Sequence, residues 1–169
     1  MEQTYVIENC KSFNARDIFE CGQCFRWNVQ EDGGYTGIFG KNVLNVKQET
    51  SRNSECGLDV PTKIIITGVC DGDIKEVCRK YFDLDRDYEA IKEKLANIDE
   101  YMKESIKYGE GIRILNQDLW EMIISFIVSA NNNIPRIKGI IDRMSKKYGT
   151  CIVFRGQEYY TFPTPEVLA

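Results

Sequence analysis

Residues 21–27 read CGQCFRW, and this stretch decides how the rest of the chain is interpreted. Cys21 and Cys24 have the spacing of a redox dithiol or of half a zinc site. A redox dithiol begins a helix that follows a strand, where the helix dipole lowers the thiol pKa. Here a predicted helix, NARDIFE, precedes the pair and a predicted strand, FRWNVQ, follows it. This order favours a tight helix-to-strand turn in which Gly22 adopts an unusual backbone angle and the cysteines are packing residues.

The composition is that of a folded protein whose overall charge does not attract nucleic acids. The chain has 169 residues, of which 43% are hydrophobic and 28% charged, and its net charge is −4. Any nucleic-acid-binding role therefore requires a local basic patch. The absence of histidine excludes Ser-His-Asp and Cys-His catalytic systems. The seven cysteines form no second close pair, so we expect neither a metal site nor a cofactor.

Alternation of apolar and polar residues dominates the first part of the chain. Turn signals at residues 32–34 (DGG) and 40–42 (GKN) join successive runs into hairpins. The predicted product is an antiparallel sheet with one covered face. Its predicted strands are TYVIE, FRWNVQ, YTGIFG, VLNVKQ and TKIIITGV.

The hydrophobic period then changes to that of helices. DIKEVCRKYF and DYEAIKEKLANI are amphipathic, whereas DLWEMIISFIVSA, residues 118–130, is apolar on nearly every face and predicts a central buried helix capped by Asp118. The fold class is therefore α+β. We predict an antiparallel sheet domain with flanking helices over residues 1–100 and an incomplete α-helical domain over residues 101–169. The final FPTPEVLA begins a helix without completing it, so we expect a piece of a longer protein.

The basic patch lies in residues 131–148. Five cations, Arg136, Lys138, Arg143, Lys146 and Lys147, face only Asp142, a local charge of 5 − 1 = +4. The asparagines at 131–133 are equally good turn and cap residues, and that alternative stays open. Their placement at the start of a basic helix would also bring backbone N–H groups, amides and a guanidinium together around a phosphate or a base edge.

Two motifs in this order resemble the 8-oxoguanine DNA glycosylase family. GQCFRW at 22–27, followed by the YTGIFGKNVLNVKQ hairpin, is similar to the family's N-terminal β domain with its G-Q-x-F-R-W pattern. FIVSANNNIPRIKGIIDRM at 126–144 is similar to the family's S/A-N-N-N-I-x-R-I segment. RKYFDLD and FPTPEVLA fit at the right places. The resemblance therefore runs from about residue 10 to the last residue.

The resemblance implies base-excision repair: an enzyme that finds 8-oxoguanine opposite cytosine in duplex DNA, flips it out and cuts its glycosidic bond through a lysine Schiff base, with an associated abasic-site lyase step. It implies that the carbonyl of Gly22 reads N7–H of the damaged base. Asn131 would fill the gap left by the flipped nucleotide, and Arg136 would contact the unpaired cytosine. Further candidates for DNA backbone contacts are Asn132, Asn133 and Lys138.

The family's catalytic residues have no counterpart in this sequence. Its helix-hairpin-helix, nucleophilic lysine and catalytic aspartate follow the FPTPEVLA segment, so we expect these 169 residues to hold recognition elements and to be inactive alone. The expected partner is double-stranded DNA containing 8-oxoguanine, bound by a monomer with no membrane association, in a bacterial-type cytoplasm or a nucleus. The alternatives are an alkylated-purine glycosylase of the same superfamily and a non-catalytic DNA-binding fragment.

Overall fold

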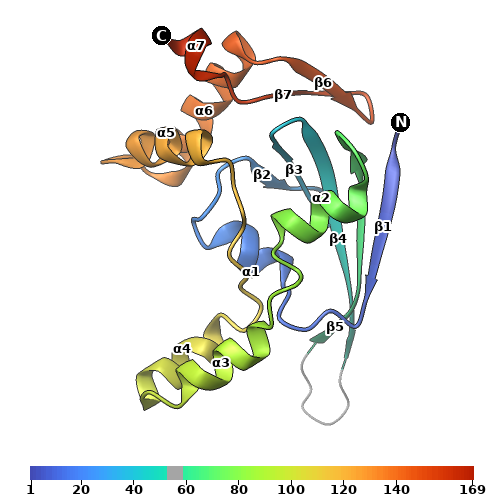
Figure 1. The fold of residues 1–169 in the computed structure, drawn as a ribbon, viewed down its shortest axis with the longest axis vertical. Coiled ribbons are helices and arrows are strands. Elements are labelled where there is room, and N and C mark those ends of the chain that lie inside the picture. The colour runs from blue at the N-terminus through green and yellow to red at the C-terminus, as the bar shows by residue number, and fades with distance from the viewer. Residues whose placement is uncertain (53–58) are drawn as a thin grey trace.

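The computed structural model describes residues 1–52 and 59–169 (Figure 1). Its centre is an antiparallel sheet of five strands in the order β1-β5-β4-β3-β2. The strands are β1 (Gln3–Glu8), β2 (Trp27–Val29), β3 (Tyr35–Phe39), β4 (Asn42–Arg52) and β5 (Asp59–Val69). The α+β class and the antiparallel sheet predicted from alternation are confirmed.

Two tight turns set the register of the central hairpins. Gly33 between β2 and β3 and Gly40 between β3 and β4 have φ of +78° and +52°, a region that glycine enters without steric cost. Trp27 pairs with Gly37 across β2 and β3. A Cβ on Gly37 would lie 2.3 Å from the Trp27 ring, so only glycine leaves room for the indole here.

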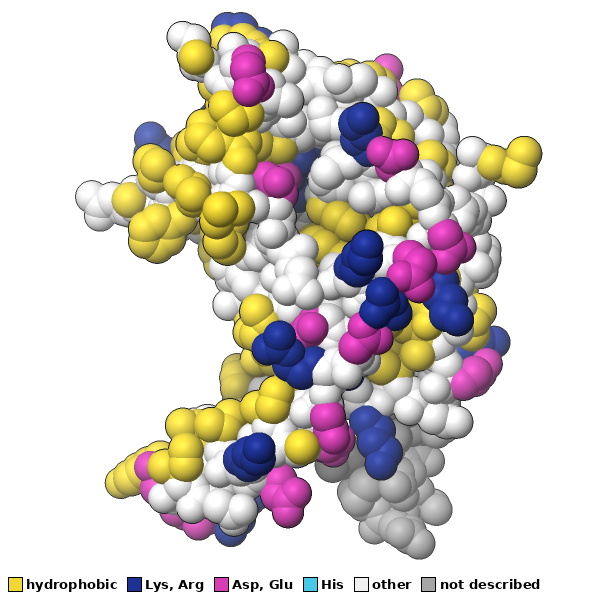
Figure 2. All heavy atoms as spheres, viewed as in Figure 1, with side chains coloured by type: hydrophobic (Ala, Val, Ile, Leu, Met, Phe, Trp, Pro, Cys, Tyr) yellow, Lys and Arg dark blue, Asp and Glu magenta, His cyan; other side chains and the backbone are white. Residues whose placement is uncertain are grey.

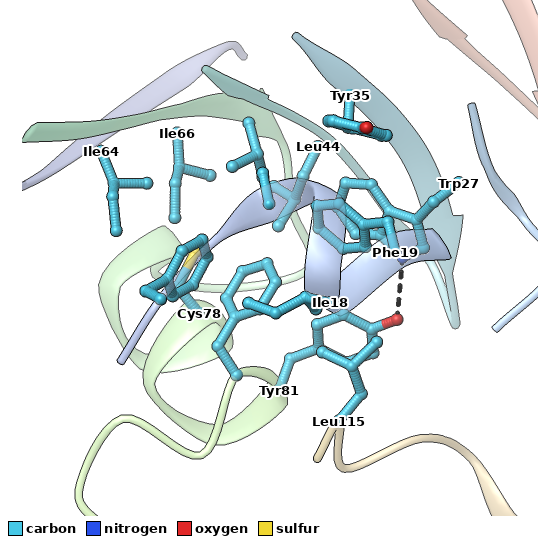
Figure 3. Packing of buried hydrophobic residues seen from close by; sticks show 14 of the residues in the cluster. Ile18, Phe19, Trp27, Tyr35, Leu44, Ile64, Ile66, Cys78, Tyr81 and Leu115 are labelled. Atoms are coloured by element: carbon cyan, nitrogen blue, oxygen red, sulfur yellow. Dashed lines mark hydrogen bonds between the residues drawn. The ribbon is translucent and has the colours of Figure 1, made fainter. Parts of the chain in front are cut away.

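Helices α1 (Ala15–Glu20) and α2 (Ile74–Tyr81) cover one face of the sheet and enclose the main core. Trp27 stacks on Phe19 with ring centroids 4.0 Å apart, and its Nε1 donates a hydrogen bond to the Tyr81 hydroxyl at 2.9 Å (Figure 3). Ile64 and Ile66 of β5 complete this layer with fully buried side chains. The last residue of CGQCFRW is therefore a core anchor.

The other face of the sheet is also partly covered, which makes the prediction of one covered face wrong. Strands β6 (Cys151–Phe154) and β7 (Gln157–Tyr160) form a hairpin across it. Phe154 packs on Ile38 and Val43, which point away from the main core. At the hairpin's tip Arg155 donates hydrogen bonds to Glu2 and to Thr67 at 2.8 and 2.9 Å. The apolar residues at the β3–β4 end of this face are what the hairpin covers.

The remaining helices lie to one side of the sheet (Figure 1). Helices α3 (Tyr88–Ala96) and α4 (Glu100–Tyr108) form a projecting pair, and an extended segment leads from them to α5 (Leu119–Ser129), α6 (Ile134–Tyr148) and α7 (Pro165–Leu168). No helix within the described ranges is long and apolar enough to cross a membrane. The division into residues 1–100 and 101–169 stays a prediction.

Helix α5 begins as predicted but is not buried. Asp118 is its N-cap, with the carboxylate accepting a hydrogen bond from the Glu121 N–H at 2.9 Å. However, Phe126 is 76% exposed and Ile127 61%. Figure 2 shows hydrophobic side chains gathered over α5 and over the α3–α4 pair. A helix that is apolar on every face is buried only where other elements cover all of those faces. Among the described residues, α6 covers one side of α5.

Candidate functional site

The turn after α1 presents a free backbone carbonyl. Gly22 has φ of +90°, which confirms the predicted unusual backbone angle. An added Cβ at this residue would have no atom within 4 Å, so the turn faces open space. Within residues 1–52 and 59–169 the Gly22 carbonyl accepts no hydrogen bond. An unsatisfied acceptor at a glycine turn is well placed to approach a planar ligand closely.

Gln23 fixes this turn through hydrogen bonds of its side chain and backbone. Its Nε2 donates to the carbonyls of Ile18 (2.9 Å) and Arg113 (2.8 Å), and its Oε1 accepts from the Leu115 N–H (2.9 Å). The backbone carbonyl of Gln23 accepts from Gln117 Nε2 at 2.6 Å. The turn is thereby tied to a segment about 90 residues away. No sequence pattern predicted this role of Gln23, because hydrogen bonds between distant segments leave no local signal.

The two cysteines beside Gly22 differ in environment. Cys24 is 6% exposed, and burial raises the pKa of its thiol to about 12. The Cys21 side chain is exposed and donates to the Ile18 carbonyl at 3.4 Å. Neither thiol is in a disulfide. The predicted packing role is confirmed for Cys24, whose protonated thiol is a poor nucleophile and metal ligand.

Arg26 joins the turn to the helical side of the molecule. Its side chain is 9% exposed, and Nη1 lies 3.5 Å from Oε2 of Glu121 on α5, itself 13% exposed. Nη2 of Arg26 donates to the carbonyl of Tyr160 on β7. Burial lowers the pKa of Arg26, while Glu121 acts in the opposite direction. Burial likewise raises the pKa of Glu121 despite the cation beside it.

The three asparagines between α5 and α6 have separate functions. Asn132 Nδ2 donates to the carbonyl of Val128 in α5 at 2.8 Å and to that of the C-cap residue Ala130 at 3.3 Å. Asn133 is the N-cap of α6, and its Oδ1 accepts from a first-turn N–H at 3.0 Å. The capping interpretation is thus confirmed for these two. Asn131 is exposed at φ of +63°, and within the described parts of the chain its side chain has no hydrogen bond. Asn131 therefore has no capping role, and DNA backbone contacts by Asn132 and Asn133 stay predictions.

Helix α6 is anchored by its buried face and by Lys138. Ile137 and Ile141 are 3% and 1% exposed. The Lys138 ammonium donates to the Trp27 carbonyl at 2.7 Å and to Asn28 Oδ1 at 3.2 Å, which joins α6 to the strand that follows the Gly22 turn. A DNA-backbone contact by Lys138 stays a prediction. In the free protein this ammonium donates its hydrogen bonds to β2. Arg136 is exposed, and its guanidinium has no partner among the described residues.

Comparisons with known proteins show the family of this chain. The sequence profile described as 8-oxoguanine DNA glycosylase, N-terminal domain, matches residues 6–123. The chain belongs to the 8-oxoguanine DNA glycosylase family. The matched residues include the Gly22 turn, its Gln23 clamp and the buried Arg26–Glu121 pair. The Asn131 to Arg136 segment lies outside them.

Solved glycosylases share the fold over nearly the whole chain. The 8-oxoguanine glycosylase/lyase of Clostridium acetobutylicum, solved apo and with double-stranded DNA containing cytosine opposite 8-oxoG, is 40% identical with a TM-score of 0.85; the match covers 99% of this chain and 55% of that one. The Saccharomyces cerevisiae N-glycosylase/DNA lyase is 47% identical over 60 residues, 35% of this chain and 16% of the relative. The chain thus spans about half the length of the solved glycosylase and less of the yeast relative.

A more distant glycosylase shares the fold alone. The 3-methyladenine DNA glycosylase of Archaeoglobus fulgidus has a TM-score of 0.60 at 14% identity. This likeness concerns architecture and gives the alkylated-purine alternative no support beyond it.

Proposed function

We propose that the protein to which this chain belongs excises 8-oxoguanine paired with cytosine from duplex DNA, as a DNA glycosylase with abasic-site lyase activity acting in base-excision repair. The observation that carries this proposal is the free carbonyl of Gly22, held at a rigid turn that Gln23 clamps. The C. acetobutylicum glycosylase with this fold was solved on DNA with cytosine opposite 8-oxoG. The test is single-turnover base release by the full-length protein from duplexes carrying 8-oxoguanine or guanine.

The Gly22 carbonyl suits this lesion because the two bases differ at N7. Guanine has an acceptor at N7, whereas 8-oxoguanine has an N–H donor, so one carbonyl oxygen bonds the damaged base and meets a lone pair on the normal one. A buried acceptor left unpaired costs about 1–3 kcal/mol, a preference of about 5- to 150-fold before repulsion is counted. To accept a hydrogen bond from N7–H of the damaged base, this carbonyl must be exposed and unpaired in the free protein, as it is here.

Asn131 and Arg136 suit the other half of the recognition. Flipping a base costs a few kcal/mol of stacking and pairing, and a side chain that fills the gap offsets part of that cost. Asn131 is the asparagine that capping leaves free. Arg136 lies in the first turn of α6, and its planar fork of donors matches the N3 and O2 acceptors of an unpaired cytosine. Adenine presents a donor as well as an acceptor there and fits less well.

Replacing Arg136 by alanine should relax the preference for cytosine opposite the lesion. A bidentate contact to a base discriminates by about 1–3 kcal/mol, so the ratio of excision opposite cytosine to excision opposite adenine should fall about 5- to 150-fold. The measurement is single-turnover excision by the full-length protein on the two duplexes. Arg143→Ala is the matched control on the same helix face and should keep the ratio. An unchanged ratio in Arg136→Ala would reject the role given to Arg136.

We further propose that these 169 residues alone neither release the base nor form a Schiff base. A nucleophilic lysine needs a desolvated site that lowers its pKa, and none of the lysines in the described ranges is buried. Borohydride reduction of the chain with an 8-oxoguanine duplex should therefore trap no covalent adduct, whereas the full-length protein should be trapped. An adduct with the 169 residues would overturn this proposal. Binding of the same duplex without trapping would favour a non-catalytic recognition fragment.

A further inference from the structure

Among the arginines whose side chains the structure describes, two have no partner, and both lie on α6. Outside residues 51–62, every arginine except Arg136 and Arg143 makes an ion pair or donates a side-chain hydrogen bond. Arg143 is exposed. The two unpaired arginines therefore form a cationic surface that makes no contact within the described parts of the protein.

The two free guanidinium groups share one face of α6. Seven residues separate Arg136 from Arg143, which is about 20° short of two full helical turns. Ile137 and Ile141 hold the other side of the helix against the rest of the protein. An added Cβ on Gly139 would lie 3.3 Å from Nη1 of Arg143, so that guanidinium leans back over Gly139 toward the end of the helix that carries Arg136.

The acid of this helix does not neutralise that face. Asp142 pairs with Lys146, with 2.9 Å between Oδ2 and Nζ. Lys147 lies one turn beyond Arg143, with its ammonium 4.9 Å from the centre of the Tyr148 ring. The face from Arg136 to Lys147 is therefore positive, although the whole chain has a net charge of −4.

We propose that Arg143 binds a backbone phosphate of the DNA strand that carries the cytosine, and so extends the surface that Arg136 begins. This inference rests on the proposed function, because Arg136 at the cytosine places that strand along α6. Seven residues span about 10 Å of helix, close to three nucleotide steps of about 3.4 Å each. The guanidinium of Arg143 can bind a phosphate through two parallel N–H donors. The ammonium of Lys146 has no such planar pair of donors and is already paired with Asp142.

The salt dependence of DNA binding tests this contact. The experiment uses the full-length protein and a duplex with an uncleavable abasic analogue opposite cytosine, and measures Kd from about 50 to 300 mM salt. Each neutralised phosphate contributes about 0.9 to the slope of log Kd against log salt, so Arg143→Ala should lower the slope by about 1. The affinity should fall most at low salt, and the preference for cytosine should not change. Arg143→Lys should keep the slope.

Lys146→Ala is the matched control, because its ammonium is already paired with Asp142, and it should leave the slope nearly unchanged. An unchanged slope in Arg143→Ala would overturn the phosphate contact. A changed cytosine preference with an unchanged slope would make Arg143 a base reader and would also overturn it. In a parallel titration, wild-type protein that binds an 8-oxoguanine duplex no better than an undamaged one would overturn the proposed function instead. The slope measured on the abasic-analogue duplex would still report on Arg143.

Discussion

Gly22→Ala is expected to lower excision of 8-oxoguanine by about 10- to 100-fold while leaving the protein folded. At φ of +90° an L residue is strained by about 1–2 kcal/mol, and the turn relieves that strain by rotating the carbonyl that reads N7–H. The added methyl group meets no atom within 4 Å, so packing is unaffected. The measurements are single-turnover excision by the full-length protein and thermal unfolding, whose midpoint should fall by only a few degrees.

Gly33→Ala supplies the matched control for backbone strain. Gly33 has φ of +78° and equally open space around an added Cβ, but it lies in the β2–β3 turn. This variant should lose a similar amount of stability and keep its activity. Full activity of Gly22→Ala, or an equal loss in Gly33→Ala, would contradict a reading role for the Gly22 carbonyl.

Arg26→Met is expected to lower the stability of the folded protein more than the glycine variants do. Removing one partner of a buried ion pair costs about 3–5 kcal/mol, because the other charge stays buried without compensation. Arg26 and Glu121 side chains are 9% and 13% exposed, and Arg26 also bonds the Tyr160 carbonyl. For a folded unit of about 150–250 residues the loss corresponds to a fall of about 6–20 °C in the midpoint of thermal unfolding. The double variant Arg26→Met/Glu121→Leu should recover part of it.

The same variant should show a defined pH dependence. Burial already raises the pKa of Glu121 in the folded protein, and the pKa rises further once Arg26 is absent. A carboxyl group with a raised folded-state pKa holds more protons in the folded than in the unfolded state, so stability falls as pH rises through that window. The destabilisation by Arg26→Met should therefore be smaller near pH 5 than near pH 8. A loss that does not vary with pH, or a double variant no more stable than the single one, would contradict this account.

Local patterns predicted most of the fold. Alternation and turn glycines gave the central strands, and the helical period with Asp118 as cap gave the start of α5. The β6–β7 hairpin escaped prediction because its strands are short and only Phe154 of its residues is buried. The exposure of α5 could not be read from its composition, since burial depends on what packs around a helix.

The candidate site divides in the same way. The glycine turn and the basic helix are local features, and the sequence indicated both. The clamp by Gln23 and the Lys138 bond to the Trp27 carbonyl join residues about 90 and 111 positions apart, which no spacing rule detects. The separate functions of Asn131, Asn132 and Asn133 likewise depend on backbone angles that three identical letters do not distinguish.

The burial of Cys24 determines how readily its thiol reacts with oxidants. Oxidants attack the thiolate form, and with a pKa of about 12 only about one Cys24 side chain in 10⁵ is ionised at pH 7. Cys78 is fully buried in the same core, and its pKa is raised for the same reason. The sulfur atoms of these two buried residues are therefore weakly reactive toward oxidants. Of the two cysteines that flank Gly22, it is therefore the exposed thiol of Cys21 that an oxidant reaches.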